Sequence, residues 1–258
     1  MTGATLPVSS RKRRIAFYIP VVLLSVTLIA FTGFILPLLP GVIAGWFNPD
    51  LFGIHQLHEM SNGALTWVTL AGVLLQLHRP ERKAAAVQMA NLVVLVSLAI
   101  SLATGTFFPG TLVFLLLTVA IAWLHPRRQE MLRLGRIRPP ALLALVMIAA
   151  VPLLLYAAAQ IRLQLGPSGA DAHGQFAHYA SMAYVVVTLL LLGLLASFGT
   201  IGWRIPAWAT GFVAIVFGLT SVVFPGQTSS VGLPWAILAI VWGLAFIGVT
   251  ELKRLKEA

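Results

Sequence analysis

Eight apolar runs separated by short polar connections limit what this chain can fold into. A helix that crosses a bilayer needs about 20 predominantly apolar residues. The expected spans cover residues 15–39, 59–78, 84–105, 111–125, 140–161, 177–199, 205–223 and 233–251. Charged residues make up 9% of the chain and hydrophobic residues 59%, whereas soluble domains carry about 25% charged residues. The sequence therefore predicts an all-α, polytopic membrane protein with eight transmembrane helices in a lipid bilayer.

Basic residues fall almost entirely in alternate connections between these runs. One set of connections holds Arg11, Lys12, Arg13, Arg14, Arg79, Arg82, Lys83, Arg127, Arg128, Arg133, Arg136, Arg138, Arg204, Lys253, Arg254 and Lys256. The other set holds a single base, Arg162. Because cytoplasmic loops carry an excess of Lys and Arg, both termini are expected to be cytoplasmic, in a plasma or inner membrane. The formal charge of +10 is then explained by orientation, and we expect no nucleic-acid partner.

The chain also reads as two related halves. A His-x-x-Ser-x-small pattern occurs twice, as His58, Ser61 and Gly63 and as His178, Ser181 and Ala183. Phe-Pro-Gly follows the third run at 108–110 and the seventh at 224–226. These matches predict two tandem four-helix repeats of the same orientation, although leucine-rich helices also resemble one another by composition. The expected divisions are a basic cytoplasmic leader (1–14), a first repeat (15–125), a basic cytoplasmic linker (126–139), a second repeat (140–251) and a cytoplasmic tail (252–258).

Histidines and acids gather in the connections opposite the basic set. The chain has no cysteine, so a metal would rely on imidazole and carboxylate ligands. The candidate metal ligands are His55, His58, Glu59, Asp171, His173 and His178. None of their spacings is diagnostic of a metal site, and a hydrated histidine at the end of a helix is the alternative for each.

A polar stripe runs along the second expected span. His58, Asn62, Thr69, Gly72 and Gln76 recur at helical spacing, which places them on one face turned toward the protein interior. Two interpretations stay open. The stripe either supplies hydrogen bonds between helices, with Gln76 reaching Gln88 or Asn91 on the third span, or lines a cofactor cavity or pathway.

A second pair of histidines, His78 and His125, ends the second and fourth spans among arginines. We interpret both as interfacial helix ends near anionic lipid headgroups. The sequence contains no Gly-x-Ser-x-Gly, no Walker lysine and no His-Glu-x-x-His, so it does not decide whether the protein is an enzyme.

Eight spans in two four-helix halves, with a histidine at the outer start of spans two and six, resemble the architecture of haem A synthases. The resemblance implies haem ligation by His58 and His178. The histidines that this family carries at spans four and eight are missing, since Thr111-Leu112 and Pro234-Trp235 stand there. A related b-type haem or quinone role is then the implied expectation. The full cofactor-binding set is His58, His178, Ser61, Ser181, Asn62 and Arg162, the arginine pairing with haem propionates or with Asp171.

The leading prediction is an integral membrane haem-binding or redox protein with a histidine site near the outer face. Haem is the expected cofactor, and a divalent metal is the second choice. A transporter for a small molecule or metal remains an alternative, as does a non-catalytic subunit that packs against partner subunits of a larger membrane complex.

Overall fold

The computed structural model describes residues 8–48, 52–131 and 140–257 of the chain. This described part is helical and contains no strand. Seven helices are long and apolar enough to cross a membrane, and an eighth apolar helix, α5 (Gly110–Leu124), is shorter. The helical membrane class predicted from the sequence is therefore confirmed, while the crossing of the membrane by α5 stays a prediction.

The helices follow the predicted order closely. The long helices are α1 (Val8–Ala30), α3 (Gln56–Leu74), α4 (Ala84–Thr104), α5 (Gly110–Leu124), α7 (Pro140–Leu165), α9 (His178–Ser197), α10 (Arg204–Val223) and α11 (Leu233–Glu257). Short helices lie between them: α2 (Leu38–Ala44), α6 (Arg128–Met131) and α8 (Ala172–Gln175). Single turns are η1 (Phe31–Ile35), η2 (Gly53–His55), η3 (Leu75–Leu77), η4 (Pro80–Arg82) and η5 (Pro167–Ala170).

Several predicted boundaries differ from the structure. Helix α1 begins at Val8, within the segment predicted as a leader, and α7 continues to Leu165, past the predicted end at 161. The first helix ends as a π-helical turn at Ile35 and does not continue to residue 39, because Pro37 cannot extend it. The last helix does not stop at residue 251 but continues to Glu257. In this extension the guanidinium of Arg254 lies 3.1 Å from the Glu251 carboxylate, and basic residues suit the C-terminal end of a helix. Most of the segment predicted as a separate tail is thus helical.

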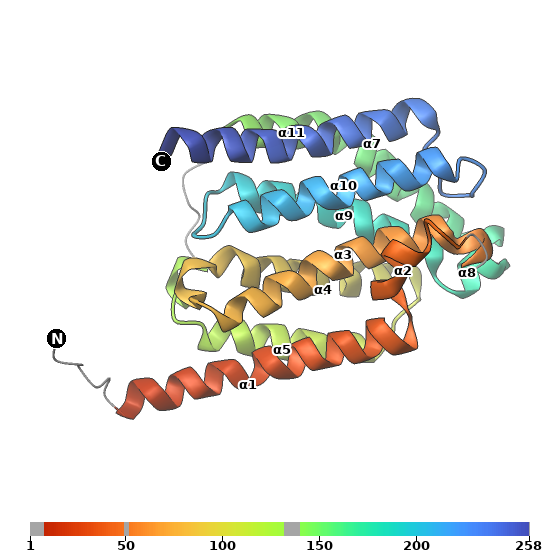
Figure 1. The fold of residues 1–258 in the computed structure, drawn as a ribbon. Helices are drawn as coiled ribbons and strands as arrows, with labels where there is room; N and C mark the ends of the chain where they lie inside the picture. Colours follow the sequence, from red (N-terminus) through yellow and green to blue (C-terminus); the bar gives the residue numbers. More distant parts are fainter. Residues whose placement is uncertain (1–7, 49–51, 132–139, 258) are drawn as a thin grey trace.

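The long helices form four layers of two (Figure 1). Helices α1 and α5 form one outer layer and α7 and α11 the other, with α3 and α4, and then α9 and α10, between them. Across the centre, α4 packs on α9 and α3 packs on α10. Burial follows this order, since 72% of the most apolar window of α9 is buried but only 22% of that of α7. The inner helices therefore form the core, and the outer helices present apolar side chains to lipid.

Each half of the chain uses the same order of neighbours. In the first half α1 contacts α3 and α5, and α4 contacts the same two helices. In the second half α7 contacts α9 and α11, and α10 contacts those two in turn. These four contacts among the long helices of the first half thus each have a counterpart in the second half.

Glycines allow α10 and α11 to approach closely. A Cβ atom on Gly211 would lie 2.6 Å from the carbonyl oxygen of Gly243, and one on Gly243 would lie 2.5 Å from that of Gly211. About two turns further along α10, a Cβ on Gly218 would lie 2.6 Å from the carbonyl of Ala236. Small residues at such positions are typical of helix pairs in membranes.

The two ends of the bundle differ in charge. The first turns of α1 and the last turns of α11 lie at the same end, while α8 and the start of α3 lie at the other (Figure 1). Arginines and lysines of the α3–α4 and α5–α6 connections and of the α11 end cluster with the chain ends, and the opposite end carries Arg162 and the histidine-rich segments. This is the segregation on which the predicted orientation depends.

His78 and His125 differ in burial, which corrects the prediction that both lie at the interface near lipid headgroups. His78 is exposed, but His125 is fully buried. Its Nε2–H donates to the carbonyl of Pro80 at 3.1 Å, and its Nδ1 accepts from the backbone N–H of Arg127 at 3.0 Å. Burial lowers the pKa of His125 to about 4, against the opposing effect of the bond to Pro80. His125 ties the end of α5 to the turn before α4.

Candidate metal centre

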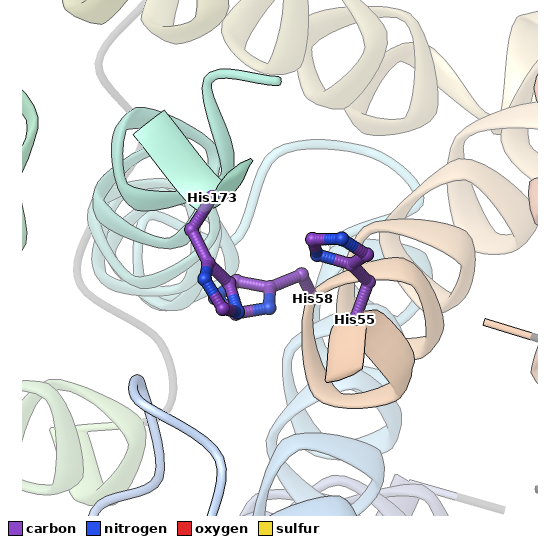
Figure 2. A group of neighbouring side chains, drawn as sticks. All are labelled: His55, His58 and His173. Carbon is purple, nitrogen blue, oxygen red and sulfur yellow. The ribbon is translucent and has the colours of Figure 1, made fainter. Parts of the chain in front are cut away.

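Four imidazoles meet at the end of the bundle away from the chain termini. The ring centroid of His55 lies 4.8 Å from that of His173 and 4.4 Å from that of His178. The ring of His58 lies 5.1 Å from His173 and 5.0 Å from His178. Figure 2 shows His55 and His58 at the start of α3 facing His173 from α8. The cluster therefore joins the start of α3 to the α8–α9 segment. Two further contacts join the same segments, from His173 to the carbonyl of Ile54 and from His178 to Glu59, each between residues 119 positions apart.

Three of these histidines can share one ion. His55, His58 and His173 each offer a ring nitrogen, and these atoms all lie within 4.8 Å of one another. Zinc–nitrogen bonds of about 2.0–2.1 Å in a tetrahedral site place ligand nitrogens roughly 3.4 Å apart. Binding one ion would therefore draw the three ring nitrogens closer together than the 4.8 Å within which they lie.

The tautomer of His58 follows from its hydrogen bonds. Its Nε2 lies 2.8 Å from the hydroxyl oxygen of Ser229, and that hydroxyl donates its hydrogen to Gln160 Oε1 at 2.9 Å. Because a serine hydroxyl has one hydrogen, His58 Nε2–H must be the donor to Ser229. The Nδ1 atom of His58 then carries the lone pair, and it is buried with no hydrogen-bond partner among the described residues. A metal ligand needs this combination of a free lone pair and an anchored N–H.

The same logic holds for His178. Its Nε2–H donates to Glu59 Oε1 at 3.1 Å, so in the neutral ring the lone pair lies on Nδ1. That Nδ1 and the Nδ1 of His55 are also buried without a partner among the described residues. Leaving a buried acceptor unpaired costs about 1–3 kcal/mol. Of the three histidines with an unpaired Nδ1, two, His55 and His58, belong to the group that can share one ion, and a bound cation would pair with both.

Asp171, one of the predicted metal ligands, braces the cluster from outside. Its carboxylate accepts the backbone N–H of Gly174 at 2.9 Å and the hydroxyl of Tyr179 at 2.8 Å. The bond from Gly174 is the main reason that the pKa of Asp171 lies below its usual value. The Tyr179 ring in turn stacks on His173 at 5.7 Å. Asp171 is exposed and lies outside the group of ligand atoms, so it positions the α8 turn and does not join the site.

Side chains from distant segments hold the backbone around the cluster. Gln164 donates to the carbonyl of Gly174 at 2.9 Å and accepts from the N–H of Ala180 at 3.2 Å, which clamps α8 against α9. Gln227 accepts from the N–H of Leu57 at 2.8 Å, which fixes the first turn of α3. Sequence reasoning missed Gln227 and Ser229, because polar residues in a short connection are ordinary and nothing in their spacing points to α3, in the other half of the chain.

The predicted cofactor residues separate in the structure. Asn62 donates to the carbonyl of His58 at 2.8 Å and to the hydroxyl of Ser181 at 2.9 Å. Ser61 is fully buried, and its hydroxyl has no partner among the described residues. Arg162 is exposed near the end of α7. Asn62 and Ser181 therefore join the two halves beside the cluster, while Arg162 faces solvent or lipid headgroups.

The predicted stripe on the second span divides into two parts. Gln76 donates to the carbonyls of Gly72 and Lys83, so the prediction that it reaches Gln88 or Asn91 is wrong. Those two side chains bond instead to the carbonyls of Met131 and Thr118. The spacing of side chains in the sequence does not show which backbone carbonyl lies within their reach.

The other part of the stripe lines a cavity of about 510 Å³ in the first half. Asn62 and Thr69 belong to its wall, and Glu59 and His178 border it at the cluster. Side chains from α1, α3, α4, α5 and α9 complete it. The stripe therefore makes hydrogen bonds in one part and lines a cavity in another. That a cofactor or a pathway occupies this cavity stays a prediction.

The predicted pair of haem ligands, His58 and His178, lies in direct contact. Their rings stack at 5.0 Å with an interplanar angle of 16°. Two axial imidazoles would instead lie on opposite faces of a porphyrin with their nitrogens toward the iron. Haem ligation by this pair stays a prediction that would require the two rings to separate.

Comparisons with protein families, with known proteins and with solved structures found no match to this chain.

Proposed function

We propose that this protein is an integral membrane metalloprotein that binds one divalent transition metal through His55, His58 and His173. The observation that carries the proposal is their three ring nitrogens within 4.8 Å of one another. The unpaired Nδ1 atoms of His55 and His58 support it. His178 stands beside them with its Nε2–H on Glu59, ready to serve as a fourth ligand or to position the others.

The donor set favours zinc. Imidazole suits zinc, copper, iron and nickel, and the chain has no cysteine thiolate to favour softer ions. Three histidines with one further position are the usual ligand set of a catalytic zinc site. When bound, such an ion supplies a Lewis acid to whatever occupies its remaining position.

Anchoring hydrogen bonds on the far side of the rings support the same proposal. Ligating histidines almost always donate their second N–H to a carboxylate, a carbonyl or a comparable acceptor. Here His58 donates to Ser229 and His178 to Glu59, and His173 Nε2 lies 3.4 Å from the carbonyl of Ile54. These contacts hold the rings in place before any ion arrives.

The membrane arrangement is proposed with the site. The shared order of helix neighbours in the two halves supports two tandem four-helix repeats. The bases gathered near both chain ends support cytoplasmic termini in a plasma or inner membrane. The histidine cluster then opens on the outer side.

Metal binding is tested directly on purified protein in detergent. We expect protein stripped with a chelator to take up about one Zn²⁺ per chain, and the variants His55→Ala, His58→Ala and His173→Ala each to weaken binding by at least tenfold. His78→Ala is the matched control, because His78 is exposed at the other end of the bundle; it should bind zinc as the unaltered protein does. The proposal would be contradicted if the protein took up no zinc, or if His78→Ala weakened zinc binding as much as the three ligand variants do. A Soret band in the unaltered protein that disappears in His58→Ala would show that the site binds haem, and would contradict the proposal of a metal ion.

A further inference from the structure

The cavity beside the histidine cluster has the size and shape of a binding site for an organic molecule. Its volume of about 510 Å³ falls within the roughly 300–1,000 Å³ that is usual for ligand pockets. Along α3 its wall extends from Glu59 to Thr69, which at 1.5 Å per residue is about 15 Å. The cavity therefore leads from the cluster toward the middle of the bundle.

Aromatic and aliphatic side chains form much of the wall. Phe31, Phe108, Phe114 and Phe176 all contribute, and Phe31 and Phe108 stack on each other at 5.5 Å. The lining contains no lysine or arginine among the described residues, and Glu59 is its single acid. Beyond Glu59 and His178, the described lining contains no other carboxylate or imidazole that could bind a cation. A neutral, lipid-soluble ligand fits this wall better than a metal ion in transit.

Six of the ten hydroxyl groups that line the wall donate their hydrogens to protein carbonyls and so present acceptors to the cavity. Thr32, Thr66 and Thr69 donate their hydrogens to the carbonyls of Leu28, Asn62 and Leu65 on their own helices. Ser101 does the same with Leu98. Because each of these hydroxyls has already donated its single hydrogen, its oxygen can only accept a hydrogen bond from a ligand. Glu59 adds a carboxylate acceptor at the end near the cluster.

We propose that the cavity binds a lipid-soluble phenol of the hydroquinone type, with its ring among the phenylalanines and its hydroxyl donating to Glu59. Acceptor-lined walls call for a donor on the ligand, and phenyl rings stack favourably on an aromatic head group. The apolar remainder of the molecule follows α3 and α4 toward Thr69. Binding of this molecule does not require the metal, although it would place the hydroxyl next to the histidines.

The head group is tested with 4-octylphenol and 4-octylanisole, which differ only in the methyl cap on the oxygen. We expect the protein in nanodiscs to bind octylphenol roughly tenfold more tightly than octylanisole, with empty nanodiscs as the blank, because only the phenol can donate to a carboxylate. We also expect 1-dodecanol to bind more weakly than octylphenol. Equal binding of octylphenol and octylanisole would overturn the donor assignment, and equal binding of dodecanol would overturn the aromatic one.

The place of binding is tested with two neighbouring residues of α4. Val94 lines the cavity, whereas Leu95 is 46% exposed on the outside of the same helix. We expect Val94→Phe to fill the cavity and weaken octylphenol binding at least tenfold, and Leu95→Phe to leave it unchanged. Zinc uptake should persist in both, which shows that each is folded and separates failure of the cavity site from failure of the metal site. Equal octylphenol binding by the two variants would overturn the proposal.

Discussion

The hydroxyl oxygen of Ser229 lies 2.8 Å from Nε2 of His58, although the two residues are 171 positions apart in the chain. Ser229 belongs to the connection between α10 and α11, and its backbone carbonyl also accepts the hydroxyl of Tyr156 at 2.7 Å. Its own hydrogen goes to Gln160. The second half of the protein thus sets the tautomer of a histidine in the first half, and leaves that histidine's Nδ1 free for a metal.

Removing this anchor should weaken metal binding without removing a ligand. We expect Ser229→Ala to lower zinc affinity by about 10–100-fold, the usual effect of losing an outer-shell partner. Competition with a chelator of known affinity measures the change. Ser230→Ala is the control, since Ser230 bonds to the carbonyl of Ser221 and not to the cluster. Unchanged zinc affinity in Ser229→Ala would show that His58 does not depend on this anchor.

The bond between Asn62 and Ser181 should contribute to holding the two halves together. Its length is 2.9 Å, between α3 and α9. Side-chain hydrogen bonds between membrane helices are worth about 0.6 kcal/mol on average. A double-mutant cycle with Asn62→Ala and Ser181→Ala, followed by unfolding in denaturing detergent, should therefore give a coupling energy of that size. A coupling of zero would mean that the bond contributes nothing.

Glycine at position 211 should be essential for the packing of α10 on α11. An added Cβ would lie 2.6 Å from the carbonyl of Gly243, so Gly211→Ala must push the helices apart. We expect a loss of about 1–3 kcal/mol, as for other overpacked sites. At Gly248 of α11 a Cβ would meet nothing within 4 Å, so Gly248→Ala should be neutral or stabilising by up to about 1 kcal/mol. The same loss in both variants would count against close packing as the cause.

Acid should destabilise the protein through His125. Burial places the pKa of this residue at about 4 in the folded state, below the value of about 6.5 for an unperturbed histidine. Between these two pH values the unfolded chain binds more protons, so the free energy of unfolding falls as the pH is lowered from about 6.5 to about 4. Protonation of Nδ1 would also remove the acceptor for the N–H of Arg127.

Thermal unfolding at a series of pH values measures this effect. The variant His125→Gln should lose less stability than the unaltered protein when the pH falls from 7 to 4.5, because the titrating group is gone. His78→Gln is the matched control and should behave like the unaltered protein, since His78 is exposed. If His125→Gln and the unaltered protein respond identically to acid, His125 is not the group responsible.

The membrane class and the helix order could be predicted from the sequence because both depend on local composition. A run of about 20 apolar residues can satisfy its backbone in lipid only as a helix. The ends of α4, α9 and α10 fall within two residues of the predicted spans, since Gly, Pro and charged residues mark those ends. The histidines at 55, 58, 173 and 178 could also be chosen, because imidazoles stand out against an apolar background.

Only the tertiary structure shows which of these histidines lie together. Nothing in the sequence shows that α3 contacts the α8–α9 segment, or that Asp171 accepts the hydroxyl of Tyr179. Nor does it show that Ser229 and Gln227, in the connection between α10 and α11, bond to the first turn of α3. Such contacts depend on which helix faces pack together, and in lipid many packings of apolar helices have similar energies. The sequence determines that helices form and that they are apolar enough to cross a membrane. The packing of small residues and a few long-range hydrogen bonds determine which side chains lie together.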